Sequence, residues 1–323
     1  MRIGVTGAGG FVGVGLIARL AEISKSRIDD ATVVAIDATL PGLLPPGVAR
    51  AEGDICDARF LDKVCADPFD VFVHLAALPG GAAEQNPRLG WQVNVEASAT
   101  LLERLAAQSK PARLVFASSI GVFGTPLPKT SVDDDTLPLP TMSYGAHKLI
   151  VEALVSDFAR RGLVDGLALR LPGIVARPRT KGGHLSAYMS NILHALSAGA
   201  AFVCPVAENA TSWLMSRTTC VDNLLHAAGL PAERLSPRRA FNLPALHLAM
   251  RDLVDAAATH FGSHVRSLVS YEPNEALQAQ FGAYPPLLTP IADGLGFRHD
   301  RDAADLVANA LELAEGSTQR GAA

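Results

Sequence analysis

The chain has 323 residues, of which 49% are hydrophobic and 19% are charged, a composition that excludes a disordered chain. Its 28 basic and 32 acidic residues give a net charge of −4, so no positive excess attracts nucleic acid or an anionic membrane. The four cysteines form no CxxC pair, which predicts neither disulfides nor a metal site. Because neither a targeting segment nor a run of about 18 apolar residues is present, we expect a soluble, cytoplasmic protein.

Strand-like and helix-like segments alternate along the first half of the chain. Buried strands are predicted at 2–6, 32–37, 71–75, 114–117 and 166–171. A helix is predicted after the first strand, ending at residue 20, and two more are predicted at 91–106 and 143–158. Such alternation predicts an α/β fold whose parallel sheet is covered on both faces.

After residue 172 the elements become shorter and mixed, which predicts a smaller α/β lobe that binds the substrate. We expect the first domain at 1–171 with a returning segment at about 214–230, and the lobe at 172–213 and 231–323. The three aspartates at 133–135 are predicted to lie in a solvated loop.

A glycine-rich turn, TGAGGFVG at 6–13, joins the first strand to the first helix. Gly7 permits the tight turn, Gly10 lets the backbone approach a pyrophosphate, and Gly13 lets the helix pack close to the strand. The phosphates would face unpaired N–H groups at the positive end of the helix. We expect the cofactor to contact Gly7, Gly9, Gly10, Phe11, Val12 and Gly13.

Asp37 ends the second strand, where a carboxylate can accept hydrogen bonds from both ribose hydroxyls of NAD. The following residues, Ala38 to Leu40, include no cation for the extra phosphate of NADP. NAD is therefore the predicted cofactor, with Asp54 and Ile55 near its adenine.

A second motif supplies groups for proton transfer. Tyr144 and Lys148 lie one helical turn apart on the same face, and Ser119 stands at the end of an earlier strand. A neighbouring ammonium favours the phenolate and lets a phenol act as a base nearer neutral pH, while the serine hydroxyl holds the substrate oxygen. Beside a nicotinamide, these three groups predict proton transfer coupled to hydride transfer.

Together with Asn94, ASSIGVFG at 117–124 and YGAHK at 144–148, these motifs resemble the extended short-chain dehydrogenases, also called NAD-dependent epimerases/dehydratases. The resemblance spans almost the whole chain. It implies a Rossmann-like doubly wound sheet of strand order 3-2-1-4-5-6-7 and a homodimer. It also implies catalysis by Ser119, Tyr144 and Lys148, with Asn94 near them. The expected cofactor site then extends to Leu75, Ala76, Ala77, Asn94, Ala117, Tyr144, Lys148, Pro172, Gly173 and Ile174.

Two neighbours of these residues receive no catalytic role. Ser118 is the weaker candidate for the catalytic serine, because Ser119 has the family's offset from Gly124. His147 is expected to point elsewhere on its helix.

Further residues of the chain indicate which reaction of the family it catalyses. Relatives that handle nucleotide sugars usually carry an arginine about seven positions before the aspartate that corresponds to Asp222, but Met215 stands there. Dehydratases of the family tend to have an acidic pair after the catalytic serine, whereas Ile120 and Gly121 follow Ser119. The stretches 74–84, 170–178, 203–206 and 212–216 resemble instead a branch that oxidises the C2 hydroxyl of a four-carbon sugar acid with NAD.

We therefore expect a small anionic sugar acid as substrate. Backbone N–H groups near Pro79, Gly80 and Gly81 are expected to bind its oxygens, and Arg177 or Lys181 is expected to supply a cation for its carboxylate. The other expected contacts are Ser119, Tyr144 and Trp213, although a tryptophan packs more often than it binds.

Three alternatives remain open. A nucleotide-sugar epimerase would return the hydride and release no NADH. A dehydrogenase could also act on another small hydroxy acid or on a polyol. An NAD-binding sensor without catalysis is disfavoured because both Tyr144 and Lys148 are present.

Overall fold

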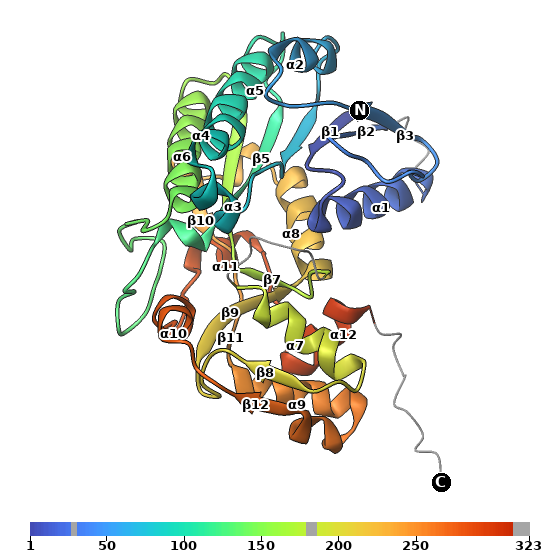
Figure 1. Cartoon of the computed structure of the whole chain (residues 1–323). Coiled ribbons are helices and arrows are strands. Elements are labelled where there is room, and N and C mark those ends of the chain that lie inside the picture. The colour runs from blue at the N-terminus through green and yellow to red at the C-terminus, as the bar shows by residue number, and fades with distance from the viewer. Residues whose placement is uncertain (27–30, 179–185, 313–323) are drawn as a thin grey trace. The chain divides into compact units, whose positions relative to one another are not determined.

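The computed structural model describes residues 1–26, 31–178 and 186–312 (Figure 1). The chain divides into two compact units. The first comprises Met1–Val122, Pro138–Leu171 and Val221–Asn242, and the second comprises Phe123–Leu137, Pro172–Cys220 and Leu243–Ala323.

These boundaries differ from the expected ones in three places: residues 123–137 and 214–220 belong to the second unit, and residues 231–242 belong to the first. Strand pairing accounts for two of the differences. Strand β9 (Thr211–Ser216) pairs within a sheet of the second unit, whereas β10 (Ala240–Asn242) pairs with β6 (Asp165–Leu171) of the first.

Seven parallel strands form the sheet of the first unit, in the order β10-β6-β5-β4-β1-β2-β3. Numbered along the chain, this is the expected order 3-2-1-4-5-6-7, so the Rossmann-like fold is confirmed. All four residues of β4 are buried, as a strand covered on both faces requires. The remaining bounds are β1 (Arg2–Thr6), β2 (Thr32–Asp37), β3 (Val48–Glu52), β4 (Val71–His74) and β5 (Arg113–Ser119).

Helices of the first unit bury their apolar faces against this sheet. Leu101 and Leu105 of one helix and Val151 and Val155 of another belong to the same buried cluster as Phe116 of β5. The helices are α1 (Phe11–Ser26), α2 (Ala58–Val64), α3 (Gly80–Gln85), α4 (Pro87–Trp91), α5 (Ala97–Ala106), α6 (Ser143–Arg160) and α8 (Arg217–Gly229), the last of which begins in the second unit.

The helix expected at 91–106 is not regular. A π-helical turn at Gln92–Glu96 separates α4 from α5, and the N–H of Ala97 bonds to the carbonyl of Gln92. The hydroxyl of Ser98 donates to the carbonyl of Asn94 at 2.8 Å, which satisfies an oxygen inside the wider turn. This turn brings Asn94 into the buried interior, where it is 2% exposed.

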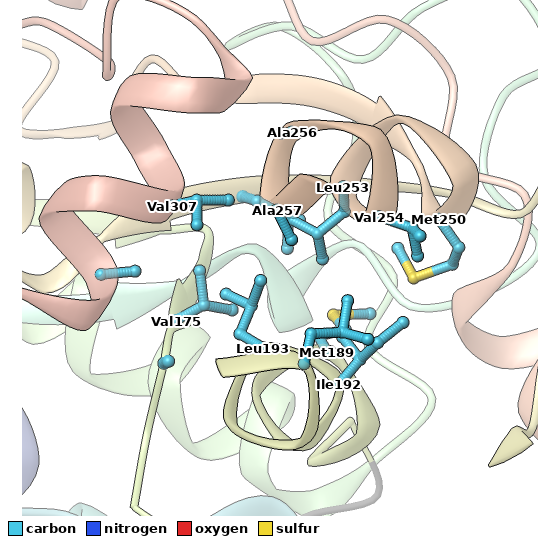
Figure 2. Close-up of a cluster of buried hydrophobic side chains, with 14 of the residues drawn as sticks. Val175, Met189, Ile192, Leu193, Met250, Leu253, Val254, Ala256, Ala257 and Val307 are labelled. Carbon is cyan, nitrogen blue, oxygen red and sulfur yellow. The ribbon is translucent and has the colours of Figure 1, made fainter. Parts of the chain in front are cut away.

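The second unit holds two small sheets, of order β11-β9-β7 and β12-β8, and a core of its own. In Figure 2, Met189, Ile192 and Leu193 of α7 face Met250, Leu253 and Ala257 of α9, with Val175 and Val307 beside them. The elements are β7 (Gly173–Val175), β8 (Phe202–Cys204), β11 (Leu246–Ala249), β12 (Val269–Tyr271), α7 (Tyr188–Ser197), α9 (Met250–Phe261), α10 (Glu275–Phe281), α11 (Pro290–Leu295) and α12 (Ala303–Leu311).

The acidic run at 133–135 is only partly a solvated loop. Asp135 is exposed, but Asp134 is buried. The neighbouring Val132 pairs with Leu287 in an isolated bridge, which draws this segment onto the second unit.

No helix within the described residues combines the length and the apolar character that crossing a bilayer requires.

Candidate active site

A cleft of about 300 Å³ lies in the first unit where β1, β2 and β4 end. This is the edge of the sheet at which doubly wound folds bind their ligands. Gly7, Gly10, Asp37, Ala38, Asp54, Ile55, Leu75, Ala76, Ala77, Leu78 and Val93 line it. All of these except Ala38, Leu78 and Val93 were expected from the sequence. Ala38 directly follows Asp37 and Val93 directly precedes Asn94, so the spacing of the two motifs could have indicated both.

At Gly7, Gly9 and Gly13 of the glycine turn, a side chain would collide with neighbouring backbone. Gly7 has φ of +68°, in the left-handed region, and a Cβ there would lie 2.7 Å from the backbone nitrogen of Ala76. A Cβ on Gly13 would collide with the carbonyl oxygen of Gly7, so glycine lets α1 begin directly against the turn. At Gly10 the nearest atom to such a Cβ is 3.2 Å away, and its backbone stays open to the cleft. This cradle fits the pyrophosphate of NAD.

Asp37 ties the glycine turn to the end of β2. One carboxylate oxygen accepts the N–H of Gly9 at 2.9 Å, and the other accepts the N–H of Thr39 at 3.2 Å. Each oxygen can accept a further hydrogen bond, so the carboxylate can still bind ribose hydroxyls. Gly9, Phe11, Val12 and Gly13, also expected at the cofactor, belong to the turn and the first turn of α1 and do not line the cleft.

Ser119 and Tyr144 border the same small residue. The hydroxyl of Ser119, at the end of β5, accepts the N–H of Gly121 at 3.0 Å. A Cβ on Gly121 would lie 3.3 Å from this hydroxyl and 3.8 Å from the ring of Tyr144. A Cβ on Gly145 would collide with the carbonyl of Gly121, so the glycine of YGAHK allows α6 to start against this turn.

Lys148 lies beneath the tyrosine ring and is 2% exposed. Its Nζ donates to the carbonyl of Ala117 at 2.7 Å and lies 5.5 Å from the centre of the Tyr144 ring. Burial lowers the pKa of Lys148 to about 7, and the carboxylate of Glu152 acts in the opposite direction. The charge of this lysine near neutral pH is therefore set by its buried neighbours.

Sequence reasoning missed a buried ion pair beside Lys148. Glu152 pairs with Arg170 at 2.9 Å and accepts the hydroxyl of Ser118 at 2.5 Å. Alternation along β5 turns Ser118 away from Ser119, and Arg170 is the register partner of Ser118 on β6. The position of Glu152, one helical turn after Lys148, could have indicated from the sequence that a carboxylate lies beside the lysine.

Asn94 supports the wall of the cleft. Its side-chain oxygen accepts the N–H of Leu78 at 2.7 Å, and its side-chain nitrogen donates to the carbonyl of Leu78 at 3.0 Å. His147, expected to point elsewhere, lies with its Nδ1 3.4 Å from that nitrogen and its ring against Trp91. Burial lowers the pKa of His147, so a neutral ring with an accepting Nδ1 is favoured.

The expected substrate residues fall into both units. Pro79 caps α3, and a Cβ on Gly80, in the first turn of that helix with Gly81, would lie 3.8 Å from the Cβ of Tyr144. In the second unit, the backbone N–H of Arg177 donates to the hydroxyl of Ser190 at 3.0 Å. Lys181 lies outside the described residues. Of the further cofactor candidates, Pro172, Gly173 and Ile174 also lie in the second unit.

Trp213, expected to touch the substrate, is a packing residue. Its side chain is fully buried, its indole N–H donates to the carbonyl of Pro285 at 2.6 Å, and its ring meets the edge of Tyr284. Among the residues that the structure describes, no group of three or more His, Cys, Asp or Glu side chains could hold a metal ion.

Residues 3–214 match the model of the NAD dependent epimerase/dehydratase family. The chain belongs to this family. The D-erythronate dehydrogenase of Cupriavidus necator is 33% identical over 97% of this chain and 98% of its own. The D-erythronate dehydrogenase of Haemophilus influenzae is 30% identical over 97% of this chain and 99% of its own.

A solved structure described as the nucleoside-diphosphate-sugar epimerase from Agrobacterium tumefaciens is similar as well, with a TM-score of 0.88 and 30% identity. The similarity covers 98% of this chain and 95% of that one. Family and relatives together confirm the resemblance inferred from the motifs. The chain is an NAD-dependent enzyme of the dehydrogenase type.

Proposed function

We propose that this enzyme oxidises the C2 hydroxyl of D-erythronate to 2-oxo-tetronate with NAD. The observation that best supports the reaction type is that Ser119 and Tyr144 both lie beside Gly121, with Lys148 beneath the tyrosine ring. The choice of substrate is supported by the two D-erythronate dehydrogenases that match nearly the full chain.

Tyr144, as a phenolate, takes the proton of the C2 hydroxyl in the proposed reaction. The hydroxyl of Ser119 donates a hydrogen bond to the same substrate oxygen and holds it in place. The ammonium of Lys148, anchored on the carbonyl of Ala117, stabilises the negative charge of the phenolate. When bound, NAD supplies the acceptor for the C2 hydride. Having lost one proton and one hydride, the substrate becomes the 2-oxo acid.

Gly7, Gly10 and Asp37 would hold the cofactor, because they line the cleft and combine an open backbone with a carboxylate. The substrate carboxylate needs a cation, and we propose Arg177 for that role.

The first test is spectroscopic. Purified enzyme is mixed with NAD and D-erythronate, L-threonate, a sugar uronate or UDP-glucose in separate reactions, and NADH absorbance is followed. NADH formation with D-erythronate alone supports the proposal, and NADH with another acid replaces the substrate but keeps the chemistry. The Tyr144→Phe variant serves as the control for contaminating activity.

A nucleotide-sugar epimerase is the second candidate, favoured by the similarity to the Agrobacterium structure. Interconversion of UDP-glucose without net NADH would overturn our choice in its favour. Met215, at the position where such relatives usually carry arginine, argues against it.

A further inference from the structure

A series of buried hydrogen bonds runs beneath the cofactor cleft of the first unit. Thr6 Oγ1 lies 2.6 Å from His74 Nδ1, and His74 Nε2 lies 2.9 Å from Ser98 Oγ. Ser98 Oγ in turn donates to the carbonyl of Asn94 at 2.8 Å. Thr6 is fully buried, and His74, Ser98 and Asn94 are each 2% exposed, so water does not compete for these bonds.

The neighbours of His74 determine which of its ring nitrogens carries the proton. Ser98 gives its single proton to Asn94 and must therefore accept from His74 Nε2–H. A neutral ring then leaves Nδ1 as an acceptor, which takes the hydroxyl proton of Thr6. Burial lowers the pKa of His74 to about 3, and the charge of Lys148 acts in the same direction, so the ring stays neutral.

Both ends of the series reach the wall of the cleft. At one end, Thr6 Oγ1 accepts the N–H of Ala76 at 3.4 Å, next to the place where Gly7 approaches the same residue. At the other end, the side chain of Asn94 holds both backbone groups of Leu78. Ala76 and Leu78 line the cleft.

We propose that His74 is a positioning residue for NAD: its neutral ring connects the glycine turn to the π-helical turn and so sets the distance between the two supports of the cleft wall. The ring acts on Ala76 and Leu78 indirectly, through the hydrogen bonds that Thr6 and Asn94 make to them. The inference concerns cofactor binding and does not depend on which hydroxy acid is the substrate.

Two substitutions of His74 separate the two bonds of its ring. His74→Gln keeps an N–H directed at Ser98 and loses the acceptor for Thr6, whereas His74→Asn keeps a polar atom near Thr6 and loses the donor to Ser98. We expect each to raise the Kd for NAD about tenfold in calorimetric titration, because each leaves one buried group without its partner. Activity is not needed for this measurement.

Substitution of Thr6 and Ser98, whose hydroxyl groups bond to the His74 ring, allows double-mutant cycles with the His74 variants. Thr6→Val should raise the Kd about tenfold alone and by a smaller factor in the His74→Gln background, where the bond to His74 is already lost and only the acceptor for the N–H of Ala76 is still removed. Ser98→Ala should likewise have a smaller effect in the His74→Asn background, where only its bond to the carbonyl of Asn94 is still lost. Thr6→Ser keeps the hydroxyl and should bind NAD as the wild type does.

Val164→Ala separates positioning from general stability. Val164 is buried just before β6, at the end of the sheet opposite the cleft, so its truncation lowers the Tm without reaching the cofactor site. If the His74 variants lose Tm to the same extent as Val164→Ala but keep the wild-type Kd for NAD, His74 only packs and the proposal is wrong. If they do not fold, the Thr6→Val and Thr6→Ser pair decides, since equal Kd values in these two would also overturn it.

Discussion

Glu152 follows Lys148 by one turn of α6, and both side chains are buried. The carboxylate is fixed by Arg170 and Ser118, so it cannot swing away from the helix face that carries the lysine. Burial and Glu152 act in opposite directions on the pKa of Lys148, which lies at about 7. Glu152 therefore helps to keep the lysine charged near neutral pH.

Glu152→Gln should move the high-pH limb of the pH profile of kcat, where the charge of Lys148 is lost, to lower pH. Lysine is charged below its pKa, and removing the carboxylate lowers that pKa further, so the charged form is lost about one pH unit earlier as the pH rises. Turnover measured from pH 5 to 9 tests this. Ser118→Ala removes one hydrogen bond but keeps the charge of Glu152, and its profile should stay in place. A Gln variant with the wild-type profile would contradict the role of Glu152.

Tyr144→Phe should reduce kcat about 10²- to 10⁴-fold, the usual contribution of a general base. The Kd for NAD should stay near the wild-type value, because the phenol is assigned to the substrate proton. Tyr271→Phe, on β12 in the second unit, loses the same hydroxyl and should keep full turnover. Unchanged kcat in Tyr144→Phe would remove the tyrosine from the mechanism.

Asp37→Asn should narrow the preference for NAD over NADP. Asparagine keeps the shape and one acceptor oxygen but removes the negative charge that repels the extra phosphate of NADP. We expect the ratio of kcat/KM for NADP to that for NAD to rise roughly tenfold. Asp37→Ala, which also leaves the N–H groups of Gly9 and Thr39 without their acceptor, should weaken binding of both cofactors. An unchanged ratio in Asp37→Asn would show that charge does not set the preference.

His74 should make the free energy of unfolding depend on pH. Its pKa is about 3 in the folded protein, against about 6.5 for an unperturbed imidazole, so between these values the unfolded chain binds more protons. Stability present above pH 6.5 is then lost as the pH falls towards 3, by up to about 1.4 kcal/mol per pH unit. Urea denaturation at pH 7, 6, 5 and 4 should show a shallower decline for His74→Gln than for the wild type. Parallel curves would mean that His74 does not titrate in this range.

The features predicted correctly from the sequence depend on local chemistry at fixed spacing. Gly7 and Gly10 of the turn and Asp37 at the end of the next strand do line one cleft, as their spacing indicated, because the requirement for a tight backbone and a carboxylate is local to these positions. The alternation of apolar strands and helices predicted the parallel sheet because the spacing of apolar residues in each element is also a local feature.

The missed features depend on tertiary contacts that spacing does not reveal. Ser118 and Arg170 meet because β5 pairs with β6 in one register, and His74 bonds to Ser98, which lies 24 residues later in the chain and beyond the π-helical turn. Trp213 was expected at the substrate, but it lies on the central strand of a small sheet, where the indole finds its acceptor in Pro285. A side chain alone does not show whether its partner will be a ligand or the protein.

The seventh strand of the large sheet comes late in the chain, at Ala240–Asn242, after the first segments of the second unit. During synthesis, β6 has no neighbour on its outer edge until about three quarters of the protein has left the ribosome. A fragment ending after β6 would leave that edge unpaired and prone to join another chain. The first unit therefore cannot complete its large sheet as an independent early product, and its completion is tied to the synthesis of Pro172–Cys220, which belongs to the second unit.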